Sequence, residues 1–428
     1  MTKVRKVGPM EILHEGARQT LDLVEGAIPR QELRVLKTFL KCYERVLKRH
    51  VDGIHSGKPI LGHHFAFPAE LFAIYDVVPV CFEAITYLLS AMFAEGAEPY
   101  YDLAHAYGHP YHSCTSQKGV MGMALKEEFM DVDVIAIPSA PCDNTVATYQ
   151  FFSEIKKVPT IVADMPYHHD ERGYEYYTNE LEHMTSELGS IINQEPNYKR
   201  LRHAVSDSSK AIEYLAEIND LRAVKPCPIE SIFNPIGSAV QNFFAGQPEK
   251  EQYYREIRDL ARSRVKKGIS YGGEERIRSY WPYMSVFFDI SFCEWMDRDL
   301  GMTAVSDLFN YFFFDPIYNA EKIPIREIYK GLAMQSMDYP MVRQSERFLD
   351  TFLDDTVFLA KKFDVDCAIF SAHIGCKQSA GLYQLIREAL RDELGIPMLI
   401  IEIDIGDKRF ASIESIKEKI TEFTKTLM

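Results

Sequence analysis

The feature that most constrains the fold of this chain is a plan that occurs twice. Residues 132–166 read VDVIAIPSAPCDNTVATYQFFSEIKKVPTIVADMP, and residues 365–404 read VDCAIFSAHIGCKQSAGLYQLIREALRDELGIPMLIIEID. Each stretch opens with Val-Asp and a short apolar segment, and reaches Cys142 or Cys376 ten or eleven residues after its first valine. A helix-forming segment and a second apolar segment follow. This pattern is typical of a βαβ unit, whose parallel strands need a long right-handed crossover.

Two such units predict an α/β protein with two Rossmann-like (flavodoxin-like) parallel-sheet domains. The length of 428 residues agrees, because one hydrophobic core stops growing at about 250–300 residues. We therefore predict four segments, which are an N-terminal helical segment over 1–55, a first α/β domain over 56–186, a helical connector over 187–267 and a second α/β domain over 268–428.

The two helical segments are predicted from apolar residues at helical spacing and from helix-forming composition. Residues 11–51 read as helical with a break at Pro29. Residues 187–267 read as helices that are interrupted over 225–235.

Charge and hydropathy exclude several classes of partner. The formal net charge of −14 disfavours binding to nucleic acid or to an anionic membrane, since both depend on an excess of Lys and Arg. The first 19 residues lack the apolar stretch of a secretory signal, and no later segment reaches about 18 uninterrupted apolar residues. We expect a cytoplasmic protein without a membrane partner, whose eight scattered cysteines are buried thiols or metal ligands rather than disulfides.

Three of the cysteines precede predicted helices. Cys142 and Cys376 follow strands, at the sheet edge where ligands of open α/β proteins collect. Cys114 precedes a helix predicted over 121–128. Because a helix N-terminus lowers a thiol's pKa, three thiolates could converge to bind iron and leave one iron of a cluster open. Spacing alone equally allows three small buried hydrophobic residues.

The other cysteines are predicted to pack in the core. None of them belongs to a local metal-binding pattern, and one lies within a predicted strand; they are Cys42, Cys81, Cys227, Cys293 and Cys367.

Short groups of residues over most of the chain resemble a known family in their order and spacing. They are Pro68-Ala69-Glu70, Cys114-Thr115-Ser116 with Lys118-Gly119, Cys142-Asp143, Pro166-Tyr167-His168, Ser371 with Cys376, and Glu402-x-Asp404 through Asp407-Lys408-Arg409-Phe410. In this respect the sequence is similar to the D-component-like subunits of 2-hydroxyacyl-CoA dehydratases, a family that includes the cluster-bearing subunits of ATP-dependent benzoyl-CoA reductase.

The resemblance implies that Cys114, Cys142 and Cys376 ligate a [4Fe-4S] cluster between two Rossmann-like domains. It further implies an acyl-CoA substrate, a related second cluster-bearing subunit, and a separate ATP-hydrolysing iron–sulfur activator that injects one electron. In the dehydratases that electron makes a ketyl radical of the thioester, water is eliminated, and the electron is recycled.

The first two predicted strands are the apolar runs over 59–61 and 77–82. The sequence departs from the family in the loop after the first of them. Residues 62–67 read GHHFAF where many relatives carry small hydroxyl residues. His63 and His64 are candidate general acid–base residues or structural histidines. His373, expected in the loop before Cys376, either contacts the cluster or substrate or has a simple loop role.

Two further groups have alternative interpretations. Arg409 either meets a thioester or phosphate, or pairs with Asp404 and Asp407. The aromatic residues of 311–314, with Trp281 and Trp295, either shape an acyl pocket or pack in the core.

The leading functional hypothesis is the iron–sulfur subunit of a 2-hydroxyacyl-CoA dehydratase that works as a heterodimer. One alternative is the corresponding benzoyl-CoA reductase subunit, which would deliver electrons for net ring reduction. The other is a non-catalytic partner that relays electrons or stabilises a related subunit. The acyl group and the nuclearity of the cluster, with a double cubane as one possibility, are open at this stage.

Overall fold

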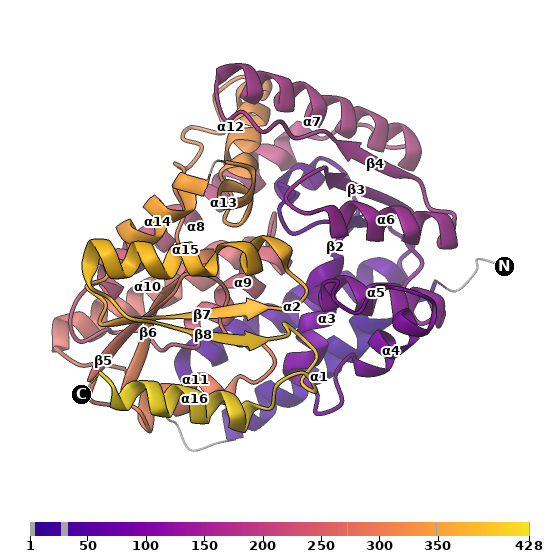
Figure 1. The fold of residues 1–428 in the computed structure, drawn as a ribbon. Coiled ribbons are helices and arrows are strands. Elements are labelled where there is room, and N and C mark those ends of the chain that lie inside the picture. The colour runs from indigo at the N-terminus through magenta and orange to yellow at the C-terminus, as the bar shows by residue number, and fades with distance from the viewer. Residues whose placement is uncertain (1–4, 27–32, 272, 348, 428) are drawn as a thin grey trace.

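The computed structural model describes residues 5–26, 33–271, 273–347 and 349–427 of the chain. Two parallel four-stranded sheets and their helices form the molecule, as Figure 1 shows. The α/β class predicted from the sequence is confirmed. The break predicted at Pro29 lies outside the described residues.

The first sheet belongs to the N-terminal half of the chain. Its strands are β1 (Ile60–His63), β2 (Val78–Cys81), β3 (Val134–Pro138) and β4 (Thr160–Ala163), in the order β2-β1-β3-β4. All neighbours are parallel, with His63 of β1 paired to Cys81 of β2 and to Ala136 of β3.

The second sheet repeats this strand order in the C-terminal half. Its strands are β5 (Ile277–Trp281), β6 (Met302–Asp307), β7 (Cys367–His373) and β8 (Met398–Ile403), in the order β6-β5-β7-β8. In both sheets the first strand therefore lies between the second and the third. This is the flavodoxin-like order, in which the strand order reverses between the first and third strands.

Both predicted βαβ units are present. The first is β3, helix α6 (Asp143–Lys156) and β4, and the second is β7, helix α15 (Lys377–Leu394) and β8. All residues of β3 and β7 are buried, because helices cover both faces of a parallel sheet and favour continuous apolar strands.

Other helices surround the sheets. In the first half they are α3 (Phe82–Met92), α4 (Glu98–Ala106), α5 (Thr115–Leu125) and α7 (Glu171–Ile192), with the 3₁₀ helix η2 (Ala69–Ile74). In the second half they are α11 (Ser291–Arg298), α12 (Ile325–Met337), α13 (Val342–Glu346), α14 (Leu349–Lys362) and α16 (Ile413–Lys425), with the 3₁₀ helix η3 (Leu308–Asn310).

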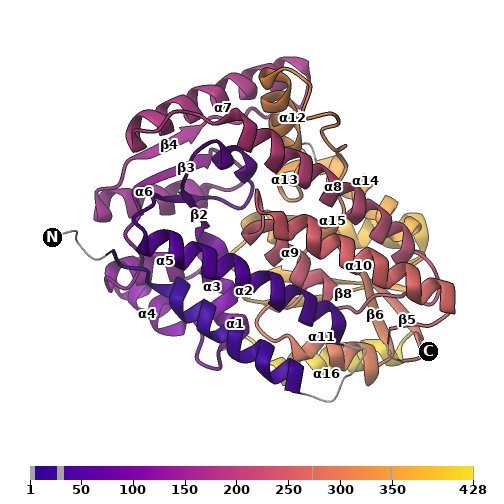
Figure 2. The ribbon, with the colours of Figure 1, turned by 180° about the vertical axis from the view of Figure 1, so that it is seen from behind.

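The remaining helices form a layer behind the sheets, seen in Figure 2. They are α1 (Pro9–Gly26), α2 (Arg34–His55), α8 (Tyr198–Arg222), α9 (Phe233–Phe243) and α10 (Pro248–Lys267), and α10 packs against both α2 and α8. The Tyr43 ring of α2 meets the ring of Phe243 edge-on at 5.3 Å. This layer contains the N-terminal helices and the helical connector that the composition predicts.

The break expected over 225–235 is shorter in the structure, because α9 already begins at Phe233. Pro235 then lies in the first turn of α9, where proline removes no helical hydrogen bond. The four predicted domain ranges stay predictions. The boundary between 186 and 187 falls inside α7, and α12 packs against that same helix.

Within the described ranges, no helix is both long enough and apolar enough to cross a membrane.

Candidate functional site

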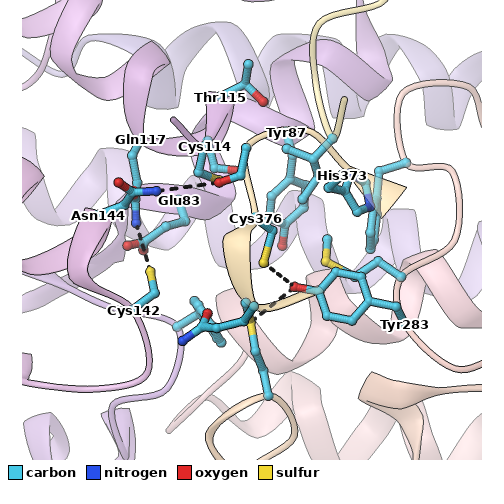
Figure 3. Close-up of a pocket in the computed structure, with 18 of the residues that line it drawn as sticks. Glu83, Tyr87, Cys114, Thr115, Gln117, Cys142, Asn144, Tyr283, His373 and Cys376 are labelled. Carbon is cyan, nitrogen blue, oxygen red and sulfur yellow. Dashed lines mark hydrogen bonds between the residues drawn. The ribbon is translucent and has the colours of Figure 1, made fainter. Parts of the chain in front are cut away.

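A cavity of about 180 Å³ lies where the carboxyl ends of strands from both sheets meet. Residues from both halves line it: Phe65 follows β1, Cys142 follows β3, Tyr283 follows β5 and Cys376 follows β7. These positions flank the strand-order reversal of each sheet, which is the usual ligand position in open α/β folds. We refer to this cavity as the central pocket; Figure 3 shows it.

Cys114, Cys142 and Cys376 all line the central pocket. They are the residues immediately before α5, α6 and α15. The prediction that each cysteine precedes a helix is confirmed, although α5 begins at Thr115 rather than near residue 121. Three segments that are far apart in the sequence thus bring their thiols to one space.

Close backbone packing between these loops fixes the positions of the cysteines relative to one another. A Cβ atom at Gly375 would lie 2.7 Å from Cys114 Cα, so only glycine allows the two loops to approach this closely. Gln378 Nε2 donates to the Pro141 carbonyl oxygen at 2.6 Å, and so joins the start of α15 to the Cys142 loop. The two halves of the molecule are therefore bonded to one another next to the thiols.

Burial makes two of the thiols weaker acids than free cysteine. It raises the pKa of Cys114 to about 12, with further contributions from the charges of Cys142, Asp404 and Cys376. Burial also raises the pKa of Cys142 to about 11, although hydrogen bonds from Thr145 oppose the shift. The expected lowering by the helix N-termini is thus outweighed, and a bound cation is needed to hold these groups as thiolates.

Hydroxyl groups accompany two of the sulfurs. Tyr283 Oη lies 3.1 Å from Cys376 Sγ, and Thr145 Oγ1 lies 2.9 Å from Cys142 Sγ. Both hydroxyls can donate to a thiolate. Hydrogen bonds of this kind tune the potential of metal-bound sulfur.

The spacing of the sulfurs decides which kind of metal group they suit. Across the described ranges, no group of three or more His, Cys, Asp or Glu side chains could hold a single metal ion. A polynuclear cluster has a different requirement, because each cysteine binds a different iron. Three thiols that line one pocket from three separate helix starts fit such a cluster.

The remaining five cysteines are buried free thiols outside the pocket lining: Cys42, Cys81, Cys227, Cys293 and Cys367. Their predicted role in core packing is confirmed for all five by their place in apolar clusters of the structure, with Cys42 in α2, Cys81 at the end of β2, and Cys293 and Cys367 around the second sheet. Cys227 packs in the adjoining cluster.

Glu83, in the first turn of α3, is a titratable group that the sequence analysis missed. It lines the central pocket with its side chain 7% exposed. Burial raises the pKa of its carboxyl group to about 7. Its Oε1 atom has no hydrogen-bond partner among the described residues.

The neighbours of Glu83 support a protonated carboxyl. Tyr149 Oη lies 2.7 Å from the His63 carbonyl oxygen and 2.9 Å from Glu83 Oε2. A hydroxyl has one proton, so Tyr149 can donate to only one of these two oxygens. All three groups are satisfied when Tyr149 donates to His63 and a protonated Glu83 donates to Tyr149.

The structure does not bring His63 or His64 into the lining of the central pocket. Both rings are buried, and burial lowers the pKa of His63 to about 4 and that of His64 well below its ordinary value. His64 Nδ1 accepts from the Ala66 amide at 3.1 Å, so its proton is on Nε2, which lies 3.8 Å from Glu83 Oε1. His64 therefore lies next to Glu83 but outside the lining of the central pocket.

His373 does line the central pocket, as the last residue of β7 rather than in the loop where it was expected. Burial lowers the pKa of its imidazole to about 3, so it is neutral near pH 7. Neither ring nitrogen has a hydrogen-bond partner among the described residues, and the ring meets Tyr283 edge-on at 5.8 Å. A neutral, unpartnered imidazole here can bond a ligand.

The structure also distinguishes the two interpretations of Arg409. Its guanidinium pairs with Asp407 at 2.8 Å and with Asp102 at 2.9 Å, which is the ion-pair alternative. Asp404 instead accepts from Thr115 and from the Gly406 and Asp407 amides.

The aromatic residues predicted to shape an acyl pocket are not those that line it. Residues 311–314, Trp281 and Trp295 are absent from the lining, and Trp281 packs in the core around the second sheet. The large apolar side chains that do line the central pocket are Phe65, Tyr87, Tyr283, Met284, Phe287, Phe309 and Met341.

Comparison with known families was made on the sequence. A family model described as 2-hydroxyglutaryl-CoA dehydratase, D-component, matches residues 64–427, which is most of the chain. The match begins at the loop after β1 and includes Cys114, Cys142 and Cys376. No curated protein matches the sequence.

Proposed function

The chain belongs to the 2-hydroxyglutaryl-CoA dehydratase D-component family, and on that premise we propose that Cys114, Cys142 and Cys376 hold a [4Fe-4S] cluster for the dehydration of a 2-hydroxyacyl-CoA. The family is a component of 2-hydroxyacyl-CoA dehydratase, a hydro-lyase, and the chain is therefore a component of an enzyme of this class.

The observation that carries the proposal is the meeting of three thiols and one carboxyl group in a single pocket. The thiols come from three helix N-termini and belong to both halves of the molecule. The carboxyl group of Glu83, with its pKa raised to about 7, lines the same pocket. The chemistry that a bound cluster supplies here is one-electron transfer and Lewis acidity at an iron without a cysteine ligand.

Glu83 is the proposed proton-transfer residue. A group whose pKa lies near the working pH can both hold and release a proton. Oε2 stays bonded to Tyr149, while Oε1 is the oxygen without a partner. We therefore assign to Oε1 the uptake of the proton that leaves the substrate carbon during water elimination.

Other residues of the chain have supporting roles in this proposal. His64 Nε2 lies 3.8 Å from Glu83 Oε1, beyond hydrogen-bond distance, and places a polar N–H beside the carboxyl group. Neutral His373 offers a ring nitrogen to the substrate. The aromatic and methionine side chains exclude water, which strengthens every polar interaction inside the pocket.

The partners follow from the family and belong to the proposal. They are a related cluster-bearing subunit and an ATP-hydrolysing iron–sulfur activator that supplies one electron, from which a ketyl radical of the thioester would form. The predicted domain ranges are 1–55, 56–186, 187–267 and 268–428, and we propose that the cluster lies between the two α/β domains.

The test is anaerobic purification followed by iron and sulfide analysis and electron paramagnetic resonance of the reduced protein. We expect about four irons and four sulfides per chain. Activity is then measured with a 2-hydroxyacyl-CoA, the partner subunit, the activator and ATP. Water loss without net electron consumption supports the dehydratase hypothesis. Net electron consumption with ring reduction would instead support the reductase hypothesis. Absence of iron and sulfide from the anaerobically purified protein would contradict the proposal.

A further inference from the structure

The apolar part of the central pocket is built from paired aromatic rings. Phe65 and Phe309 meet edge-on with ring centroids 6.4 Å apart, and Tyr87 and Phe287 lie 5.6 Å apart. Asn242 Nδ2 donates to Tyr87 Oη at 2.9 Å, so the one polar atom of these four rings is already bonded. The four rings are buried apart from the face of Phe65, and they present carbon to a ligand.

Two methionines complete this apolar wall. Met284 lines the pocket beside the rings, and Met341 Sδ lies 3.9 Å from Tyr283 Oη. Methionine is unbranched and polarisable, and it adapts to the shape of an apolar group next to it. The methionine side chains of this wall can therefore adapt to acyl groups of different shape.

The charges of the lining have one predominant sign. Asp143 and Asp404 are acidic, and the only Lys or Arg of the lining is Lys377, which is exposed at the start of α15. The buried Lys118 lies outside the lining, and its Nζ donates to the Tyr111 carbonyl oxygen at 2.8 Å. A carboxylate at the far end of an acyl chain would therefore lose its water in this pocket without a buried cation of the lining to pair with. Burial of an unpaired charge is strongly unfavourable, and nearby carboxylates add repulsion.

Resting on the dehydratase function proposed above, we propose that the central pocket takes an uncharged acyl group with a ring or a branched alkyl chain, and rejects the dicarboxylic acyl group named in the family's description. Phe65, Tyr87, Phe287 and Phe309 select the apolar group. Rings are favoured because edge-on and offset aromatic contacts are attractive beyond the burial of area.

The test measures binding rather than turnover. The cluster-loaded protein, in complex with its partner subunit, is titrated with three unreactive CoA thioesters that lack the 2-hydroxyl group: glutaryl-CoA, 4-methylpentanoyl-CoA and 3-phenylpropanoyl-CoA. We expect each uncharged thioester to bind at least about 30-fold more tightly than glutaryl-CoA. Equal or tighter binding of glutaryl-CoA overturns the inference.

Met341→Arg sharpens this test by placing a cation at the apolar wall. We expect it to reduce the preference, so that glutaryl-CoA binds at least about 10-fold more tightly than to the unchanged protein. Leu385→Arg is the matched control, since Leu385 is exposed on α15 and outside the lining, and it leaves all three affinities unchanged. An unchanged preference in a folded Met341→Arg protein counts against the inference.

Phe287→Leu provides a second variant if Met341→Arg does not fold. We expect it to weaken binding of 3-phenylpropanoyl-CoA about 5-fold or more while 4-methylpentanoyl-CoA is little affected, since one ring partner is lost. Equal weakening of both would contradict selection by the rings. Failure of the dehydratase proposal is distinguishable, because it is measured separately as missing iron and sulfide or as no water loss from a 2-hydroxyacyl-CoA, whereas this inference fails on the order of the three affinities.

Discussion

The two halves of the molecule share one strand order but contribute different chemistry to the central pocket. The first half supplies Glu83 and the amides and hydroxyls next to Cys142, including Gln117 and Asn144. The second half supplies most of the apolar wall, from Tyr283 to Met341. A repeated backbone topology therefore delivers equivalent positions with different side chains. We call the groups around Glu83 and Cys142 the polar wall; the apolar wall comes mostly from the second half, with Phe65 and Tyr87 added by the first half.

The two halves differ in the number of pocket cysteines that they contain. Cys142 and Cys376 are equivalent, since each follows the third strand of its sheet. Cys114 lies between the second and third strands of the first half, and the matching connection between β6 and β7 has no cysteine. In the proposed cluster, this asymmetry would give three cysteine ligands rather than two or four, and one iron would be left without a thiolate.

The largest effect on iron content and activity is expected when one of the two equivalent cysteines, Cys142 or Cys376, is replaced. Either Cys142→Ser or Cys376→Ser should remove most iron and sulfide and abolish dehydration, since a neutral hydroxyl is a poor ligand for iron. Iron analysis and the resonance spectrum of the reduced protein measure this. Cys42→Ala is the control: Cys42 is buried in α2, away from the pocket, and its loss should leave the iron content intact.

The next effect concerns the polar wall. Glu83→Gln should lower kcat by about 10²–10⁴-fold, which is the usual contribution of one proton-transfer group. The pH–rate profile should also lose the limb near pH 7, where the raised pKa of Glu83 lies. Full activity in this variant would favour a non-catalytic role for the chain.

Stability gives a second measurement on the same variant. The native carboxyl of Glu83 keeps its proton up to about pH 7, whereas the unfolded carboxyl releases it near its ordinary value of 4.5. The native state therefore binds more protons between these values, and the free energy of unfolding falls as pH rises through this window, then levels off. Glu83→Gln should remove a decline of roughly 3 kcal/mol from a series of denaturant titrations.

Glu346→Gln is the matched control for both measurements. Burial and the charge of Asp143 raise the pKa of Glu346 to about 7 as well, but Glu346 does not line the pocket. Like Glu83→Gln, Glu346→Gln should reduce the fall in the free energy of unfolding with rising pH. Unlike Glu83→Gln, it should leave the limb of the pH–rate profile near pH 7 in place.

A smaller effect tests the contact between the two halves. Gly375→Ala places a Cβ against the Cys114 backbone, so the Cys376 loop must move away; overpacking of this kind costs about 1–3 kcal/mol. We expect a lower midpoint of thermal unfolding and a lower iron content. Gly381→Ala is the control, because nothing lies within 4 Å of its Cβ position in α15, and alanine there should stabilise the helix by about 0.5–1 kcal/mol. Equal iron content in the two variants would show that the two loops need not be in close contact.

Sequence patterns predicted the parts of this structure that depend on local periodicity. Both βαβ units, the helical N-terminus and the helices that begin after Cys114, Cys142 and Cys376 are of this kind. Apolar runs bounded by turns and helix-forming segments identify such elements one at a time. Parallel pairing then brings the ends of the strands to one edge, which is why the meeting of the cysteines was predictable.

Side-chain direction in the loops was not predictable, because it depends on tertiary packing. His63 and His64 turn into the protein, where His64 Nδ1 accepts from the Ala66 amide, and Glu83 takes the place in the pocket instead. A signal for Glu83 was available, since it directly follows the second predicted strand. Its importance comes from burial against Tyr149, which is 66 residues away in the chain. Likewise, the short η3 turn places Phe309 in the pocket rather than residues 311–314.

The smallest expected effect compares one hydroxyl from each wall. Tyr283 Oη contacts Cys376 Sγ, and Thr145 Oγ1 contacts Cys142 Sγ. A hydrogen bond to a thiolate stabilises the more negative, reduced state of a cluster, so Tyr283→Phe and Thr145→Val should each lower the reduction potential. A difference of about 1 kcal/mol between the two oxidation states corresponds to about 40 mV for one electron. Thr145→Ser keeps the hydroxyl and should keep the potential. Equal shifts would mean that the two walls act alike on their sulfurs, whereas a shift for one variant alone would mean that the asymmetry of the pocket extends to the ligands themselves.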